Sequence, residues 1–194
     1  MKAALLTGVS IYLIGRANRL TSTLALILAV LVLAGMVFSD QLVAAIGSGF
    51  SGDKFALTST LTRIMLPFLP LVSLAAVSMG MLNSLDHFFV PAVSSACFNV
   101  VAIVVGAGLW FAGFDERTAV IGWAIGTLLG GAAQFFVQSP SLWREGWRFR
   151  PRFDVLFRDP GMRRIAILMG PATLGLAATQ VNIAVNSSFA SHEP

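Results

Sequence analysis

Residues 63–99 read RIMLPFLPLVSLAAVSMGMLNSLDHFFVPAVSSACFN, and this stretch decides the fold of the chain. Two long apolar runs are separated by a short polar segment, 83–87, and each run has a proline near its start, Pro67 or Pro91. Asn99 lies within the second run. In a membrane, prolines and lone amides are tolerated inside helices where neighbouring helices satisfy the polar groups. The stretch therefore predicts a helical hairpin in lipid whose polar atoms face other helices.

The composition is that of a membrane protein. Of the 194 residues, 56% are hydrophobic and only 11% are charged, whereas an ordinary soluble domain has about 25% charged residues. The formal net charge of +4 can suggest a nucleic-acid partner, but the cations cluster beside apolar runs. In such positions they set topology or contact lipid headgroups. We expect membrane lipids as partners and no nucleic acid.

The sequence shows no motif of an enzyme. Cys97 is the single cysteine, which excludes an intrachain disulfide and a thiolate metal cluster. The two histidines, His87 and His192, are far apart and lack the spacing of metal ligands. No nucleophile elbow, zinc-protease or phosphate-loop motif occurs. We therefore expect no catalytic residue, no metal and no cofactor.

Charge-free apolar runs predict an all-α fold, a polytopic transmembrane bundle of about five spans, because a span needs roughly 20 apolar residues. Residues 1–19 are expected to form an interfacial or truncated helix, with a cleaved signal peptide as the weaker alternative. Residues 20–191 form the membrane domain and 192–194 a tail. The predicted spans cover residues 20–39, 63–82, 89–111, 118–138 and 165–188.

Small residues indicate where these helices pack or bend. Gly122, Gly126 and Gly130 are four residues apart, so they share one face of the fourth predicted span, where another backbone can approach closely. A packing role and a functional hinge both remain open for them. Gly170 and Pro171, near the start of the fifth span, are typical of a kink.

The fifth predicted span carries a polar stripe of Gly175, Thr179, Asn182 and Asn186, at spacings of four, three and four. Such a stripe faces protein or water, because an amide facing lipid would lose its hydrogen bonds. It therefore either bonds to another helix or lines a hydrophilic cavity. Together with Asn99, its polar side chains Thr179, Asn182 and Asn186 are our candidates for a substrate path.

The connection over residues 143–164 is strongly basic. It contains Arg144, Arg148, Arg150, Arg152, Arg158, Arg163 and Arg164, interleaved with Trp147, Phe149, Phe153 and Phe157. Mixed cations and aromatics can stack on nucleic-acid bases, but between two membrane spans they favour contact with anionic headgroups. We assign headgroup contact to Arg144, Arg148, Arg150 and Arg152.

The distribution of Lys and Arg predicts the orientation. The N-terminal flank and the connection over 143–164 lie on one side with ten cations, while the connections on the other side carry three. The positive-inside rule then places the N-terminus in the cytoplasm and the C-terminus outside.

Four stretches, taken together, resemble one family, the MurJ/MviN lipid II flippases of bacterial peptidoglycan synthesis. They are GFSGDKFALTSTLTRIMLPF (49–68), GMLNSLDHFFVPA (80–92), GGAAQFFVQSPSL (130–142) and RDPGMRRIAILMGPATLGLAATQVN (158–182). The resemblance implies that the five spans are helices three to seven of a longer, two-lobed transporter of the inner membrane. It further implies that the whole protein moves an undecaprenyl-linked precursor by alternating access, in cell wall biogenesis and the maintenance of cell shape.

This likeness is partial, and it leaves alternatives open. The family's cavity arginines lie in its first and eighth helices, which are not recognisable here, and Arg63 is expected to be a topological or headgroup anchor. We therefore expect a segment of a flippase that does not transport alone. A segment of a related exporter of drugs or other lipid-linked sugars, and a non-transporting scaffold or remnant, are the alternatives.

Overall fold

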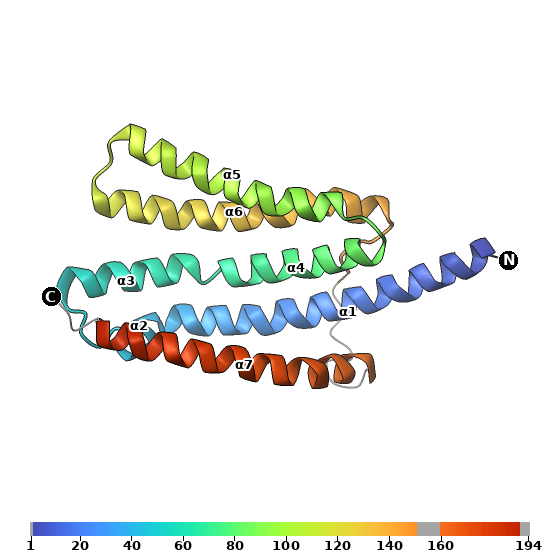
Figure 1. Cartoon of the computed structure of the whole chain (residues 1–194), viewed down its shortest axis with the longest axis horizontal. Helices are drawn as coiled ribbons and strands as arrows, with labels where there is room; N and C mark the ends of the chain where they lie inside the picture. Colours follow the sequence, from blue (N-terminus) through green and yellow to red (C-terminus); the bar gives the residue numbers. More distant parts are fainter. Residues whose placement is uncertain (1, 151–159, 191–194) are drawn as a thin grey trace. The chain divides into compact units, whose positions relative to one another are not determined.

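In a computed structural model of the chain, the structure describes residues 2–150 and 160–190, with side chains from residue 18 to 150 and at 167, 170, 171 and 173–190. These residues form helices and short connections, which confirms the predicted all-α fold. The helices are α1 (Lys2–Val37), α2 (Ser39–Ile46), α3 (Gly52–Met65), α4 (Phe68–Ser84), α5 (Phe89–Ala112), α6 (Glu116–Arg144) and α7 (Pro160–Ala190) (Figure 1). Arg152 and the predicted tail 192–194 lie outside the described residues.

Four helical segments of the described part are long and apolar enough to cross a membrane. They are Asn18–Val37, Gly52–Ser84, Phe89–Ala112 and Glu116–Arg144, and they overlap the first four predicted spans. The fifth predicted span, 165–188, falls within α7, where side chains are described only in part. It stays a prediction.

α1 differs from the expected division of the N-terminal region. Because of Arg16 and Arg19, we expect a short helix over residues 1–19 that is separate from a span beginning at residue 20. The structure has one helix over Lys2–Val37. Residues 1–37 contain no proline, and Gly15, next to Arg16, is tolerated inside a helix at a cost of about 1 kcal/mol relative to alanine.

The three predicted bending prolines sit in different helical contexts. Pro67 lies between the end of α3 and the start of α4, where its missing N–H and its ring interrupt the helix. Pro91 is in the first turn of α5, where a missing N–H has no intrahelical partner to lose, and it is buried. Pro171 lies inside α7. Pro140, which we did not single out, lies inside α6.

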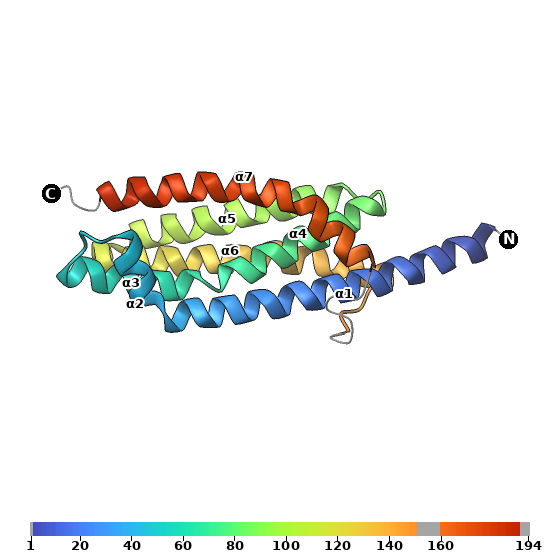
Figure 2. The same cartoon turned by 90° about the horizontal axis from the view of Figure 1, so that it is seen from below.

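The chain divides into two compact units, residues 1–32 with 64–154 and residues 33–63 with 155–194. In the first unit α5 and α6 are antiparallel neighbours in both views, and α6 also packs against α4 (Figures 1 and 2). In the second unit α7 contacts α2, and Ser48 and Ser188 share a hydrogen bond of 3.1 Å.

The glycines of α6 face α5. A β-carbon added at Gly126 would lie 2.5 Å from a methyl carbon of Val105. At Gly122 it would lie 2.7 Å from Leu109, and at Gly130 2.9 Å from Phe98. We call Gly122, Gly126 and Gly130 the glycine seam.

Two further glycines extend this close packing. Gly131 of α6 faces Phe68 of α4, at 2.8 Å from an added β-carbon. In the reverse direction, Gly106 of α5 accepts the indole ring of Trp123 from α6. Helices approach this closely only where one side lacks a side chain, and such contacts drive helix association in lipid.

α4 and α6 end with the same local geometry, the Schellman motif, in which a left-handed residue closes the helix. At the end of α4, Asp86 has φ of 60°, and the His87 N–H donates to the Leu82 carbonyl at 2.9 Å. At the end of α6, Gly146 has φ of 81°, and the Trp147 N–H donates to the Leu142 carbonyl at 2.9 Å.

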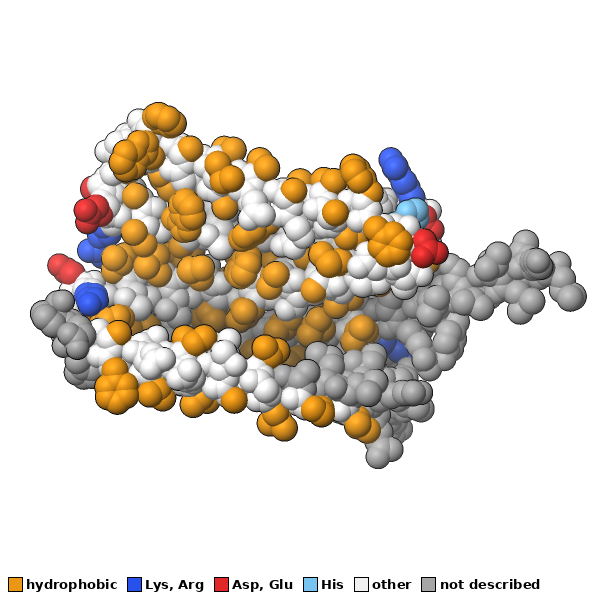
Figure 3. Space-filling model, in the orientation of Figure 1, with side chains coloured by type: hydrophobic (Ala, Val, Ile, Leu, Met, Phe, Trp, Pro, Cys, Tyr) orange, Lys and Arg blue, Asp and Glu red, His pale blue; other side chains and the backbone are white. Residues whose placement is uncertain are grey.

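These two helix ends are fastened to each other. Leu82, Leu142 and Trp147 form a buried apolar cluster. His87 Nε2 lies 2.9 Å from Glu145 Oε1 at the rim of that cluster. The turn after α4 and the beginning of the basic connection therefore lie at one end of the first unit. Figure 3 shows charged side chains gathered at the helix ends and hydrophobic side chains covering the lengths between them.

Candidate functional site

Gln138 of α6 is a fully buried amide in an apolar helix pair. Its Nε2 donates to the carbonyl of Ala75 in α4 at 3.2 Å and to that of Gln134 at 3.0 Å. Its Oε1 is buried and has no hydrogen-bond partner in the described structure. Ser78, one helical turn from Ala75 on α4, is also buried. The Gln138 side chain therefore joins α6 to α4 by a hydrogen bond.

Our sequence reasoning missed Gln138, although it lies in a charge-free run. The available signal was a pair of glutamines four residues apart, Gln134 and Gln138, at the end of the fourth predicted span, since an amide buried between membrane helices needs a partner. Three candidates in the fifth span were chosen on that ground.

Asn99, the candidate in α5, is exposed. Its Nδ2 donates to the Ser95 carbonyl one turn earlier in its own helix, at 3.3 Å. It does not take part in the α5–α6 packing face, where Phe98 meets Gly130. One hydrogen bond of the Asn99 amide is thus made within its own helix, and its other donor and acceptor positions are exposed.

The polar stripe of α7 keeps its spacing in the structure. Its members, Gly175, Thr179, Asn182 and Asn186, are all exposed. The Thr179 hydroxyl donates to the Gly175 carbonyl at 3.4 Å, and Asn186 Nδ2 donates to Asn182 Oδ1 at 3.4 Å. Bonds within one helix leave several donors and acceptors of each amide unused. Asn99 belongs to the first compact unit and the stripe to the second.

Arg63, expected as an anchor, is paired with an acid in the second unit. Its Nη2 lies 2.9 Å from Asp40 Oδ2, and its Nε donates to the Ser39 hydroxyl at 2.5 Å. Ser59 donates to the same carboxylate, and both serines are buried. This network joins α3 to the start of α2. It neutralises Arg63, so this guanidinium is not a free cation for an anionic substrate.

In the described part of the basic connection one aromatic residue is buried, while Phe149 is exposed like the neighbouring arginines. Arg144, Arg148 and Arg150 are exposed, whereas Trp147 is buried. The backbone N–H of Arg150 donates to Asn18 Oδ1 of α1 at 3.2 Å. This indole belongs to the packed core, so it is not available to stack on a base, while the three guanidinium groups remain accessible to headgroups.

Within the described residues, no group of three His, Cys, Asp or Glu side chains is placed to hold a metal ion. Gly170 has nothing within 4 Å of an added β-carbon. The polar positions of the membrane helices are therefore amides and hydroxyls, which suit hydrogen bonding to another helix, to water or to a polar solute.

Comparisons with known proteins agree on one family. Residues 17–193 match the family described as lipid II flippase MurJ. A probable lipid II flippase MurJ of Vibrio cholerae is 32% identical over 182 residues, which cover 89% of this chain and 34% of that protein. The lipid II flippase MurJ of Burkholderia cenocepacia is 31% identical over 178 residues, which cover 90% of this chain and 34% of that protein.

A probable lipid II flippase MurJ of Buchnera aphidicola subsp. Schizaphis graminum is 33% identical over 169 residues, which cover 86% of this chain and 32% of that protein. The chain thus spans about a third of the length of the curated relatives that it matches. The match nevertheless includes every described span and both polar candidate regions. The chain belongs to the lipid II flippase MurJ family.

Proposed function

We propose that residues 17–193 supply most of one lobe of a flippase that moves an undecaprenyl-linked peptidoglycan precursor across the bacterial cytoplasmic membrane. The observation that carries this proposal is the family match over residues 17–193, which includes four helices able to cross a membrane. Alternating access needs two lobes that rock around a shared site. A packed helix group such as α4–α6 is suited to move as one body in that process.

The proposed orientation places the end of α6 in the cytoplasm. The clustered ends of α4 and α6 support it, because Leu82 and Leu142 pack together there and the exposed Arg144, Arg148 and Arg150 follow at the same end. Cytoplasmic connections carry the excess of Lys and Arg. The N-terminus is then cytoplasmic and the C-terminus external.

We place the substrate path along the polar stripe of α7, with Asn99 as a second lining position. The exposed amides of Asn182 and Asn186 retain hydrogen-bonding capacity for water or sugar hydroxyls. A pyrophosphate also needs cationic partners. Between their end residues, the five predicted spans contain no Lys or Arg, so the rest of a flippase has to supply them. These 194 residues by themselves are expected not to transport.

A chimera tests this proposal. In the full-length relative from Vibrio cholerae, the matching third is replaced with residues 17–193 of this chain. We expect the chimera to sustain growth of cells depleted of their own flippase and to translocate labelled lipid II in vesicles. A chimera that inserts into the membrane at normal levels but fails both assays contradicts the proposal. Translocation of lipid II by this chain alone in liposomes would refute the expectation that it needs the other helices.

A further inference from the structure

One side of α5 forms a continuous apolar stripe. Its members are spaced three, four or seven residues apart, so they share one face of the helix. They are Phe89, Ala96, Val100, Val104, Ala107 and Phe111, and all six are exposed. None of them has a polar side chain, and Asn99, which precedes Val100, points about 100° away from it around the helix axis. We call these six residues the α5 stripe.

The other side of α5 packs on α6 in a different way. There Val105 meets Gly126 and Leu109 meets Gly122, as expected of helices that associate in lipid through small residues. The α5 stripe offers no such seam, because its two alanines lie three turns apart with Val100 and Val104 between them. It offers no hydrogen-bonding group either. Its chemistry therefore favours hydrocarbon over a second helix or water.

The length of the α5 stripe matches the hydrocarbon core of a bilayer. From Phe89 to Phe111 the helix rises about 33 Å at about 1.5 Å per residue, and the hydrocarbon is about 30 Å thick. Residues 88–114 contain no charged residue. Asp115 follows and caps α6, because its Oδ2 accepts from the Thr118 N–H at 3.2 Å. Its bonds to Thr118 hold its pKa below the usual value, so a charged carboxylate lies just beyond the stripe.

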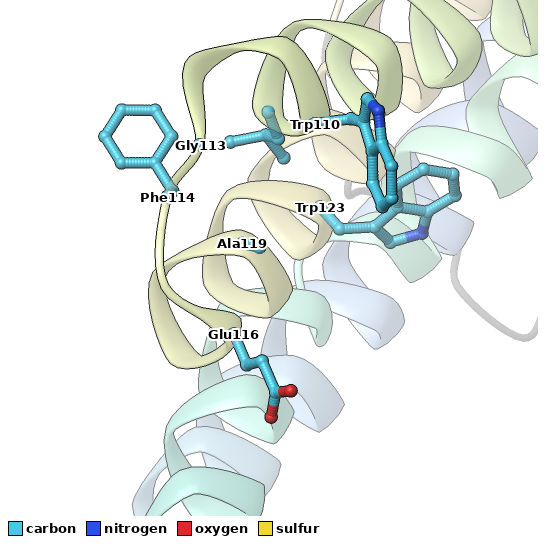
Figure 4. A pocket seen from close by; sticks show the side chains of 8 residues that line it. Trp110, Gly113, Phe114, Glu116, Ala119 and Trp123 are labelled. Carbon is cyan, nitrogen blue, oxygen red and sulfur yellow. The ribbon is translucent and has the colours of Figure 1, made fainter.

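Tryptophan side chains mark the end of the hairpin beside Asp115. Trp110 is 82% exposed and Trp123 52%, and Figure 4 shows their indole rings close together, with the Glu116 carboxylate pointing away from both. The indole of Trp123 lies over Gly106, where any side chain would displace it. Tryptophans at the ends of membrane helices lie at the level of the headgroups. A pocket of about 400 Å³ beside the two indoles is lined mainly by apolar side chains, which suits an acyl chain.

We propose that the α5 stripe lies against the acyl chains of membrane lipids, and that Trp110 and Trp123 hold its end at the headgroup level of the adjoining leaflet. Phe89 and Phe111, which are 79% and 86% exposed, then lie near the two boundaries of the hydrocarbon. α5 is the lipid-facing wall of its lobe, while Asn99 points to another side. That this leaflet is the external one rests on the proposed function.

Nitroxide scanning of the chimeric flippase tests the proposal in vesicles of phosphatidylethanolamine and phosphatidylglycerol. In a cysteine-free chimera made with Cys97→Ala, the positions from 98 to 111, except Gly106, are changed one at a time to cysteine and spin-labelled. Electron paramagnetic resonance measures the accessibility of each label to oxygen, which concentrates in hydrocarbon, and to a water-soluble nickel chelate. Oxygen accessibility should oscillate with a period of about 3.6 residues. Its maxima should fall at Val100, Val104, Ala107 and Phe111.

Val104 and Val105 form a matched pair, because they are adjacent valines and Val105 faces Gly126. Oxygen accessibility should be several-fold higher at Val104. Low oxygen accessibility at both Val100 and Val104 would show that another helix or a second copy covers the stripe, and high nickel accessibility there would show water; either result overturns the proposal. The ratio of oxygen to nickel accessibility should be lower at Phe111 than at Val104, and equal ratios would contradict the headgroup level of that end.

The scan and the proposed function can fail separately. The scan requires only that the chimera inserts into the membrane, whereas growth of flippase-depleted cells reports transport. A chimera that inserts and shows the expected oscillation but does not sustain growth contradicts the proposed function alone. A chimera that sustains growth without oxygen maxima at Val100 and Val104 contradicts the lipid-facing stripe alone.

Discussion

α6 and α7 are similar in length and composition, but their side chains are buried to different extents. They have 29 and 31 residues, each contains one internal proline, and both are rich in small residues. In α6 the glycines Gly126, Gly130 and Gly131 are buried against α5 and α4. In α7 almost every described side chain is exposed, and Gly170 and Gly175 meet nothing within 4 Å.

The difference shows what makes small residues a packing face. Glycine spacing becomes a packing seam only where large side chains lie opposite, as Val105 does for Gly126. The glycines of α7 have no such partners, because an added β-carbon at Gly170 or Gly175 meets nothing within 4 Å.

The largest expected effect is a loss of stability when the close contact between α6 and α5 is disrupted. Gly126→Leu places a bulky side chain where even a β-carbon lies 2.5 Å from Val105. Overpacking of this kind costs about 3 kcal/mol or more when neither backbone can yield. Denaturant unfolding of the purified chain in micelles should show the loss. Gly108→Leu is the control, because Gly108 of α5 has open space around it, and it should leave stability unchanged or raised. Equal losses in the two variants would mean that α5 and α6 are not in close contact.

A smaller loss of stability is expected when the buried amide of Gln138 is removed, and a smaller one still for the exposed amide of Asn182. Gln138→Ala removes a fully buried side chain and should cost about 2 kcal/mol, the lower range for creating a cavity. Gln138→Leu keeps the volume and removes an oxygen without a partner, so its cost should stay below about 1 kcal/mol. Asn182→Ala on the exposed face of α7 should change the stability of this chain by less than about 0.5 kcal/mol. An Asn182→Ala loss as large as that of Gln138→Ala would show that α7 is packed within this chain.

The ion pair of the second unit should contribute still less to the free energy of unfolding. Arg63 and Asp40 are 46% and 53% exposed, and half-exposed pairs contribute about 0–1 kcal/mol. A double-mutant cycle with Arg63→Ala and Asp40→Ala, measured by thermal unfolding, isolates that coupling. It should shrink as salt is raised. A coupling that does not respond to salt would indicate that the pair is shielded from solvent.

The smallest expected effect is a pH dependence at the start of α6. The folded-state pKa of Asp115 is lowered by its bonds to Thr118, so the cap contributes stability above the unfolded value of about 3.9. This contribution is lost as the pH falls through the lower folded pKa. Asp115→Asn keeps a good capping side chain without a titrating group. The acid sensitivity of the melting temperature should therefore be smaller in this variant than in the wild type, and an identical acid profile would contradict the assignment.

Much of the architecture could be predicted from local patterns. Charge-free runs of sufficient length place the first four spans, because hydrocarbon excludes charges and demands helices whatever the tertiary contacts are. The Schellman end of α4 has no such signal. Asp86 adopts a left-handed conformation there, although glycine is the usual residue.

Which side chains contact one another across different helices could not be predicted in the same way. Arg63 finds Asp40, 23 residues earlier, and Trp147 folds into the core although it lies in a basic connection. Both outcomes depend on how helices meet, which a single chain's spacing does not encode. For the same reason the burial of Gln138 could not be predicted, because it follows from the approach of α4 to α6.

The central claim is that α4–α6 form a packed body while the stripe of α7 faces an aqueous path. Cysteine accessibility in the chimeric flippase tests it most directly, in a cysteine-free background made with Cys97→Ala. We predict that Asn182→Cys and Asn186→Cys react with a membrane-impermeant maleimide, while Val181→Cys and Ala184→Cys on other faces of α7 remain unlabelled. Labelling of Val181→Cys and Ala184→Cys as strongly as the asparagine positions, or protection of both asparagine positions, would contradict the account.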